Sequence, residues 1–443
     1  MFEKILIANR GEIAVRIIRA CREMGIATVA VVSEADRDTL HAYLADEVVC
    51  VGSAPSNESY LNIQNILSAA VTRGAAAIHP GFGFLSENAE FAEICERCNL
   101  TFIGPPAECI RLLGDKSAAK NTMMSHGIPT IPGSNGEVGS PDEAKTLAET
   151  IGYPLLVKAS AGGGGRGIRQ VNGPGELESA YRSAGEEALK FFGHDGVYME
   201  RLLQNPRHVE VQILADSFGH VIHLGERDCS MQRRRQKVIE ETPCIALTDE
   251  QREKMGVAAV NAARATGYVN TGTVEFLLDS TGEFYFMEMN TRIQVEHTIT
   301  EMVTGVDLIQ KQIEIAAGRP LGLTQEQVHP RGHAIECRIN AEIPEKGFMP
   351  SGGTVEGLYV PGGFGVRFDT ALYQGYTLPM HYDSMVGKLV AHAATRGEAI
   401  AKMKCALREL IIEGVQTNAV YQHELLSDDA FLSGNYHTGT IQG

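Results

Sequence analysis

The sequence predicts a multidomain protein that combines an α/β part with α+β parts. With 443 residues the chain is too long for one ordinary hydrophobic core, so two to three domains are expected. The first quarter alternates strand-like and helix-like patterns, which is typical of a doubly wound, mostly parallel sheet. The remainder carries a long β-hairpin and several consecutive strands, which indicates mixed α+β domains there.

The composition is that of a soluble globular protein, with 44% hydrophobic and 21% charged residues. The net charge of −16 argues against a broad nucleic-acid surface, and no apolar run approaches the roughly 20 residues of a membrane span. The N-terminus does not resemble a signal peptide. The nine cysteines lack regular spacing, and Cys95 and Cys98 form a lone CxxC without the second pair that zinc would need. We therefore expect reduced thiols in a cytoplasmic protein without membrane or nucleic-acid partners.

The N-terminal domain is predicted to begin with a β-α-β unit over residues 4–33, whose helix closes at Gly25. The segment NRGEIA stands where a glycine-rich dinucleotide fingerprint would lie, so an NAD site is poorly supported. Alternation of strands and helices continues to about residue 114. The loop at residues 79–88, HPGFGFLSEN, follows a strand, where α/β sheets present ligand sites, although its glycines equally fit plain turns.

A glycine run lies at the centre of the next region. A helix from about residue 115 and a Pro/Gly/Ser-rich connector lead to residues 153–171, which read as strand, four glycines and strand. Because a strand follows the loop, it is neither a Walker loop nor a Rossmann turn, both of which open a helix. It fits a flexible flap over a triphosphate, with a mobile hairpin tip as the alternative. Lys158 precedes the glycines and either snorkels outward or points at a phosphate.

A basic segment, residues 226–241, concentrates Arg233, Arg234, Arg235 and Lys237. Such a run is usually a solvated loop, but beside a phosphate site it would hold anions.

The hairpin at residues 271–297 carries the candidate chemistry. Its turn is DSTGE, and if the second strand stays extended, side chains two apart share a face. One face would then carry Glu288, Asn290, Arg292, Gln294 and Glu296. The opposite face would carry Tyr285, Met287, Met289, Ile293 and Val295.

The alternative to a catalytic hairpin is an ordinary amphipathic strand with a wet polar face. Glu275 in the first strand argues against it, because an unpaired carboxylate is costly to bury within an apolar run. Glu275, Glu288 and Asn290 offer the oxygen ligands that Mg²⁺ takes beside substrate phosphates. Arg292 would face developing negative charge, and Glu296 would serve as a base.

The C-terminal part is predicted to contain strands after a helix at 306–318. Residues 332–342, 353–363 and 365–379 read as strands. The final clear helix, residues 397–414, carries an apolar stripe and is expected to end at Gly414. The stripe consists of Ile400, Met403, Leu407, Leu410 and Ile411.

Seven segments, in this order and spacing, resemble biotin carboxylase, the ATP-grasp subunit of bacterial acetyl-CoA carboxylase. They are IANRGEIAVRIIRAC, HPGFGFLSEN, GGGGRG, ERDCSMQRR, EMNTRIQVEH, ECRINAE and YDSMVGKL. The likeness runs essentially from end to end, and EMNTRIQVEH with ERDCSMQRR is its most specific part. It implies an N-terminal domain at 1–114, an ATP-grasp region at 115–317 with a lid at about 131–203, and a C-terminal domain at 318–443.

The resemblance also implies roles for individual residues. ATP would be bound by Lys116, Lys158, Gly163, Gly164, Gly165, Glu200, Leu203 and His208. Two Mg²⁺ or Mn²⁺ ions would be held by Glu275, Glu288 and Asn290. The bicarbonate pocket would comprise Lys237, Arg292, Gln294, Val295 and Glu296, and Arg338 would contact the biotin ureido oxygen. A homodimer interface would include Arg16, Arg19, Glu23, Phe364 and Arg367.

Three positions depart from the family pattern. Arg235 stands near the nucleotide where a histidine is frequent, Ala161 shortens the glycine run, and Phe82 replaces a tyrosine near the biotin pocket. The chain lacks a Met-Lys-Met acceptor motif, so biotin is expected on a separate biotin carboxyl carrier protein, with a separate carboxyltransferase. Acetyl-CoA is the default final acceptor, and pyruvate or propionyl-CoA systems are the alternative. Another ATP-grasp ligase and a non-catalytic nucleotide sensor are the rival functions.

Overall fold

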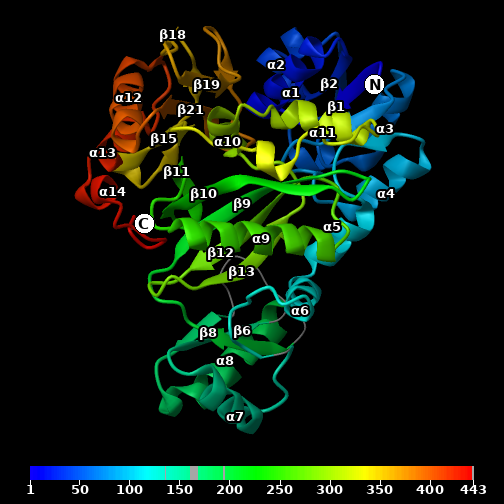
Figure 1. The fold of residues 1–443 in the computed structure, drawn as a ribbon. Coiled ribbons are helices and arrows are strands. Elements are labelled where there is room, and N and C mark those ends of the chain that lie inside the picture. Colours follow the sequence, from blue (N-terminus) through cyan, green and yellow to red (C-terminus); the bar gives the residue numbers. More distant parts are fainter. Residues whose placement is uncertain (135, 160–167, 193–194, 442–443) are drawn as a thin grey trace.

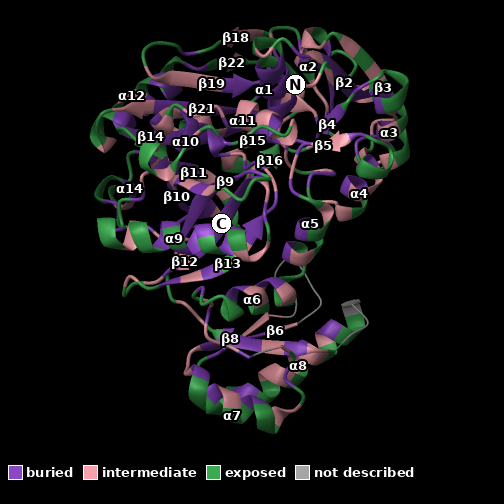
Figure 2. Cartoon of the chain, turned by 45° about the vertical axis from the view of Figure 1, so that its right-hand side comes forward, coloured by how far each residue is buried: buried purple, intermediate pink, exposed green. Residues whose placement is uncertain are grey.

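The computed structural model describes residues 1–134, 136–159, 168–192 and 195–441 (Figure 1). An N-terminal parallel sheet and a long antiparallel sheet lie side by side, and a small lid projects away from both (Figures 1 and 2). Buried residues concentrate in the strands of the long sheet, whereas the outer faces of the peripheral helices are exposed (Figure 2). Within the described residues, none of the helices combines the length and apolar character needed to cross a bilayer.

The N-terminal sheet is parallel and doubly wound, as the sequence predicts, with the order β3-β2-β1-β4-β5. Its strands are β1 (Lys4–Ile7), β2 (Ala27–Ser33), β3 (Glu47–Gly52), β4 (Ala77–His79) and β5 (Thr101–Phe102). Its helices are α1 (Gly11–Glu23), α2 (Leu40–Leu44), α3 (Ile63–Thr72), α4 (Ala89–Arg97) and α5 (Ala107–Gly114). Ile5 and Ile7 join one buried cluster and Leu6 another, because successive strand residues face opposite sides. Both faces of this sheet are therefore covered.

The lid is a three-stranded antiparallel sheet with two helices and its own apolar core. Its elements are α7 (Pro141–Ile151), β6 (Leu155–Ala159), β7 (Ile168–Val171), α8 (Pro174–Phe192) and β8 (Val197–Arg201), with α6 (Lys116–Ser125) leading into it. Helix α7 begins where the Ser140 side chain accepts a hydrogen bond from the Glu143 amide, and it ends at Gly152, whose φ is +80°. The glycines and Ala161 of the predicted flap lie outside the described residues.

The long sheet has the order β13-β12-β9-β10-β11-β14-β21-β19, and all neighbouring strands are antiparallel. Its strands are β9 (Arg207–Ala215), β10 (Val221–Arg233), β11 (Gln236–Thr242), β12 (Asn270–Leu278), β13 (Phe284–Asn290), β14 (His333–Asn340), β19 (Val366–Thr370) and β21 (Met385–Ala393). The helices associated with it are α9 (Asp249–Ala265), α10 (His297–Thr304), α11 (Leu308–Ala316) and α12 (Arg396–Glu409). Strand β11, before residue 317, pairs with β14, after it, so the sheet contains strands from both sides of the predicted domain boundary. The boundary stays a prediction.

The remaining elements are short. The strands are β15 (Glu342–Ile343), β16 (Met349–Pro350), β17 (Gly353–Thr354), β18 (Gly357–Tyr359), β20 (Thr377–Leu378) and β22 (Ile411–Glu413). The helices are α13 (Ala419–Leu425) and α14 (Asp429–Ser433), and the 3₁₀ turns are η1 (Glu34–Asp36), η2 (Ser56–Glu58), η3 (Gln325–Gln327) and η4 (Pro344–Lys346).

Two expectations about local structure are wrong. Helix α12 ends at Glu409 rather than Gly414, because Leu410 is extended and Ile411 starts β22, which pairs with β18. The basic segment 226–241 is mostly strand rather than loop. Arg234 and Arg235 form a two-residue turn between β10 and β11 with φ values of 49° and 66°, the left-handed backbone that a tight hairpin requires.

Candidate active site

A cleft of about 1790 Å³ lies where the N-terminal domain, the lid and the long sheet meet. Most residues predicted for the site line it: Phe82, Lys116, Lys158, Glu200, His208, Arg235, Lys237, Glu275, Glu288, Asn290, Arg292, Gln294, Val295 and Arg338. Leu202 lines the cleft, whereas the predicted Leu203 does not. Glu296 is fully buried behind the lining residues. Gly163, Gly164 and Gly165 lie outside the described residues.

The three predicted metal ligands lie together because of strand pairing. Glu275 on β12 is directly opposite Glu288 on β13, and Thr273 is opposite Asn290. Paired residues of an antiparallel sheet point to the same face, so the two carboxylates and the amide share the cleft side. The amide nitrogen of Asn290 has no hydrogen-bond partner among the described residues. This set offers oxygen donors of the kind that Mg²⁺ prefers.

The predicted alternation along the second strand is wrong in two respects. A β-bulge follows the Glu275–Glu288 pair, so Met289 faces the same core cluster as Phe286 instead of sharing a face with Met287. Strand β13 also ends at Asn290, and the chain turns before α10. The side chains from residue 292 to residue 296 therefore converge through a turn.

Side-chain hydrogen bonds hold this turn against the sheet. Arg292 donates from Nη1 to Gln294 Oε1 at 2.7 Å, and Gln294 donates from Nε2 to Glu275 Oε1 at 3.0 Å. Arg292 Nε also pairs with Glu87 Oε2 at 2.9 Å, and the amide of Thr291 donates to the same carboxylate at 3.2 Å. Glu87 lies in the predicted ligand loop HPGFGFLSEN, so that loop orients Arg292 as well as lining the cleft.

Lys237 is the central cation of the site. Its Nζ lies 2.6 Å from Glu210 Oε2, 3.1 Å from Glu275 Oε1 and 2.6 Å from Glu296 Oε1. Burial disfavours the charged ammonium, but the three carboxylates outweigh that effect and hold the pKa of Lys237 well above its ordinary value. One ammonium thus lies among three buried carboxylates that converge from strands β9 and β12 and from the start of α10.

Glu296 is held by two cations. Its Oε1 contacts Lys237, and its Oε2 accepts from Arg338 Nη2 at 3.0 Å. Burial by itself would raise the pKa of Glu296, but Lys237 and Arg338 hold it well below the ordinary value. Arg338 donates from Nε to Glu240 Oε1 at 2.6 Å.

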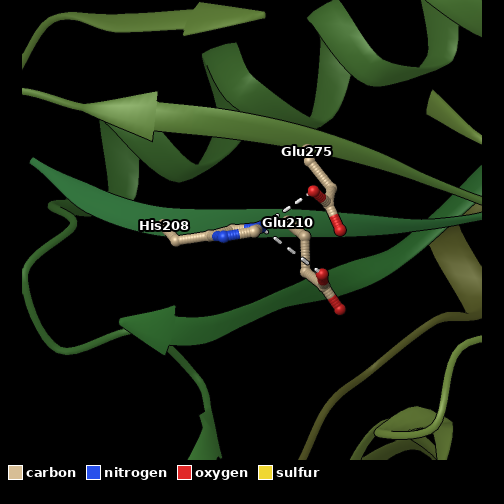
Figure 3. A group of neighbouring side chains, drawn as sticks. All are labelled: His208, Glu210 and Glu275. Atoms are coloured by element: carbon tan, nitrogen blue, oxygen red, sulfur yellow. Dashed lines mark ion pairs between the residues drawn. The ribbon is translucent and has the colours of Figure 1, made fainter. Parts of the chain in front are cut away.

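His208, Glu210 and Glu275 form a compact group, with the imidazole pointing between the two carboxylates (Figure 3). His208 Nε2 lies 3.2 Å from Glu275 Oε2 and 3.8 Å from Glu210 Oε2. Sequence reasoning missed Glu210, although it follows His208 by two residues on one strand and so shares its face. Arg227, which is fully buried, pairs with Glu210 Oε1 at 2.6 Å.

Lysines gather at the lid side of the cleft. Lys158 pairs with Glu200 across β6 and β8, and Lys116 Nζ lies 3.3 Å from Glu288 Oε2. Sequence reasoning missed Lys120, one helical turn after Lys116. Its Nζ has no hydrogen-bond partner among the described residues, and burial lowers its pKa. Three ammonium groups in one cleft suit an anion with several negative charges.

The comparisons with known proteins cover the whole chain. Residues 1–110 match the model of the biotin carboxylase N-terminal domain, residues 115–324 the ATP-binding domain of the carbamoyl-phosphate synthase L chain, and residues 336–443 the biotin carboxylase C-terminal domain. A biotin carboxylase from Nostoc sp. is 58% identical over 441 residues, covering 100% of this chain and 99% of the relative.

Solved structures agree. The crystal structure of a biotin carboxylase–βγ-ATP complex from Campylobacter jejuni has a TM-score of 0.93 and 51% identity, covering 99% of this chain and 98% of that one. The dimeric biotin carboxylase domain of 2-oxoglutarate carboxylase from Hydrogenobacter thermophilus, in complex with MgADP, ADP and bicarbonate, has a TM-score of 0.91 and 50% identity, covering 99% of this chain and 97% of that one. The chain therefore belongs to the biotin carboxylase family, ATP-dependent ligases of the ATP-grasp class that carboxylate biotin.

Proposed function

We propose that this chain activates bicarbonate with ATP and then carboxylates biotin on a separate biotin carboxyl carrier protein. This would be the first half-reaction of an acetyl-CoA carboxylase, which leads to malonyl-CoA and fatty-acid synthesis. The observation that carries the proposal is Glu296, a buried carboxylate between Lys237 Nζ at 2.6 Å and Arg338 Nη2 at 3.0 Å. A site for bicarbonate needs a base and cations together, and this arrangement supplies both.

ATP would lie between the lid and the sheet. Lys116, Lys120 and Lys158 line that side of the cleft and would bind its phosphates. The Campylobacter jejuni and Hydrogenobacter thermophilus proteins were solved with nucleotides, and the latter with magnesium and bicarbonate. Glu275, Glu288 and Asn290 fit two divalent ions, Mg²⁺ or Mn²⁺, which would neutralise charge on the phosphate oxygens.

Bicarbonate would bind next to the proposed metal ligands, against Lys237, which lies 3.1 Å from Glu275, and Arg292, which lies 3.2 Å from Asn290. Glu296 would take the bicarbonate proton as the bicarbonate oxygen attacks the γ-phosphorus, giving carboxyphosphate and ADP. The lowered pKa of Glu296 is due to Lys237 and Arg338. An anion bound to these same cations would weaken their hold on Glu296 and raise its pKa, making it a better base.

Biotin would accept the carboxyl group at this site. Carboxyphosphate would break down to CO₂ and phosphate, and the phosphate would remove the N1′ proton so that N1′ attacks CO₂. Arg338 would stabilise the negative charge on the ureido oxygen, and Phe82 and Val295 line the same cleft. Closure of the lid would exclude water, which would otherwise hydrolyse carboxyphosphate.

A homodimer is the proposed assembly. The Hydrogenobacter thermophilus domain is described as a dimer. Of the predicted interface residues, Arg19 and Glu23 are exposed and Phe364 is 96% exposed. Arg16 and Arg367 instead pair internally with Glu301, at 2.9 and 2.7 Å. We therefore expect Phe364 to contribute most of the apolar contact, with the two arginines acting mainly within the subunit.

The final acceptor separates the proposed function from its alternative. A carboxyltransferase partner would pass the carboxyl group to acetyl-CoA, whereas a pyruvate or propionyl-CoA system would use another partner.

All nine cysteines carry free thiols. The carrier, the carboxyltransferase and the cytoplasmic location stay predictions.

ADP release tests the proposal. We expect release to require both bicarbonate and biotin, because the base and the acceptor site act in sequence. ATP turnover that is indifferent to both would refute it. Co-purification of a biotinylated carrier, followed by identification of the compound carboxylated, would separate the acetyl-CoA assignment from its alternative.

A further inference from the structure

Two buried glutamates without an assigned role lie directly behind the site. Glu240 on β11 and Glu336 on β14 are cross-strand partners, and both are fully buried. Partners in an antiparallel pair project to the same face, here the face that carries Arg338 two residues after Glu336.

Each of these carboxylates has one oxygen engaged and one oxygen free. Glu240 Oε1 accepts from Arg338 Nε at 2.6 Å, and Glu336 Oε2 accepts from the Thr298 hydroxyl. Glu240 Oε2 and Glu336 Oε1 have no hydrogen-bond partner among the described residues. Two adjacent buried carboxylates cannot both ionise cheaply, so the arrangement favours one proton on the pair.

The hydrogen-bond partners of the two engaged oxygens both lie next to Glu296. Thr298 lies in the first turn of α10, two residues after Glu296. Arg338 contacts Glu296 directly, at 3.0 Å. Glu336 therefore holds the helix turn that presents Glu296, while Glu240 holds the guanidinium that faces it.

We infer that Glu240 and Glu336 are positioning residues for the carboxylation step, Glu240 as the anion that orients Arg338 and Glu336 as its neutral neighbour that fixes the start of α10. The inference rests on the roles proposed above for Glu296 and Arg338. Glu240 and Glu336 themselves touch neither proposed substrate.

The electrostatics of the pair agree with this division. Burial raises the pKa of Glu240 to about 7 even with Arg338 beside it. Burial, followed by the charge of Glu240, raises the pKa of Glu336 well above its ordinary value. Glu336 is thus the member of the pair that favours the neutral form, and Glu240 gains its charge near pH 7. The groups that act on the pair from neighbouring elements are Lys237, Glu296, Arg338 and Lys388, with the thiols of Cys229 and Cys337 close by.

The division of charge predicts an asymmetric response to the same conservative change. Glu240→Gln removes the anion and should lower biotin-dependent kcat/KM by about tenfold or more at pH 8, because a charge-assisted hydrogen bond to Arg338 is lost. Glu336→Gln replaces a neutral carboxyl by a neutral amide and should stay within about threefold of the parent protein, because the Thr298 hydrogen bond survives. The KM for ATP should be unchanged in both variants, since neither residue lines the cleft.

The pH dependence separates positioning from a merely structural role. Protonation of Glu240 removes the same anion that Glu240→Gln removes. The ratio of parent to Glu240→Gln kcat/KM should therefore shrink as the pH falls from 8 to 6, through the pKa of about 7. A structural defect would leave this ratio constant. If Glu240→Gln does not fold, the acid limb of biotin-dependent kcat/KM near pH 7, present in the parent protein and in Glu336→Gln, carries the test.

Three outcomes would overturn the inference: equal losses in the two Gln variants, a ratio independent of pH, or no acid limb near pH 7 in the parent protein. Glu296→Gln serves as the reference for the proposed function. If the parent protein itself carboxylates no biotin, the proposed function fails; if Glu296→Gln carboxylates biotin at the parent rate, the proposed role of Glu296 as the base fails. If the parent protein carboxylates biotin and Glu296→Gln does not, while Glu240→Gln matches the parent protein, only the present inference fails.

Discussion

Lys237→Met should convert a charge-balanced site into one that must take up protons. In the parent protein Lys237 lies within 3.1 Å of three buried carboxylates, those of Glu210, Glu275 and Glu296. Methionine keeps most of the side-chain volume but removes the cation. Breaking a buried ion pair by removing one partner costs about 3–5 kcal/mol, so we expect a loss of that size in the free energy of unfolding at pH 8.

The sign of the pH dependence gives the sharper test. In the parent protein Lys237 lowers the pKa of Glu275 and Glu296, so their stabilisation is present above the unfolded pKa and is lost only in acid. In the variant, burial without the cation raises the pKa of these carboxyls above the unfolded value. The folded variant then binds extra protons, and it gains about 1.4 kcal/mol per pH unit for each proton taken up.

The assay is denaturant unfolding of both metal-free proteins between pH 8 and pH 5. We expect the difference in free energy of unfolding between the parent protein and Lys237→Met to narrow as the pH falls. Lys254→Met is the matched control, because Lys254 is exposed on α9 and pairs with the exposed Glu250, so its small effect should not depend on pH in this range. If this difference stays constant or widens toward pH 5, the claim that Lys237 compensates the charge of the three buried carboxylates is refuted.

Further substitutions test other contacts. The guanidinium of Arg10 pairs with Asp36 at 2.6 and 2.8 Å. Asp36→Asn leaves this guanidinium without its anionic partner and should lower the free energy of unfolding by about 3 kcal/mol. Arg10 lowers the pKa of Asp36, so the difference should narrow in acid, below the unfolded pKa of about 4; a constant difference would contradict the ion pair. Glu288→Gln should weaken binding of MgADP by about tenfold in calorimetry while ADP with chelator binds as before, and equal losses would argue against a metal ligand. Glu87→Gln should lower biotin-dependent kcat by about threefold at unchanged KM for ATP, because Arg292 loses a partner at 2.9 Å, and a change confined to KM would contradict that role.

Elements with strong local signals could be predicted from the sequence. The β-α-β unit at residues 4–33 matches because its strands are short, apolar and bounded by Gly and polar residues, so neighbours in the chain decide the structure. The end of α12 could not be predicted in this way. Leu410 and Ile411 fit helical spacing, but pairing of β22 with β18 overrides that local pattern.

The candidate site shows the same division. Its candidate metal ligands and basic residues lie in segments with informative spacing. Glu210 had a signal, since it follows His208 at strand spacing, and Glu87 lay within the loop already singled out. No sequence signal singled out Glu240, because its proposed role depends on the cross-strand pair that it forms with Glu336, almost a hundred residues away in the chain. The bulge beside Glu275 was equally hidden, because hydrophobic alternation does not register one extra residue.

Transfer of labelled bicarbonate to biotin by Glu296→Ala addresses the site's chemistry most directly. The buried carboxylate between Lys237 and Arg338 is taken to be the base, not part of the nucleotide site. The variant should bind ATP with the affinity of the parent protein and place no label on biotin. Label on biotin at the parent rate, or loss of ATP binding, would contradict that assignment.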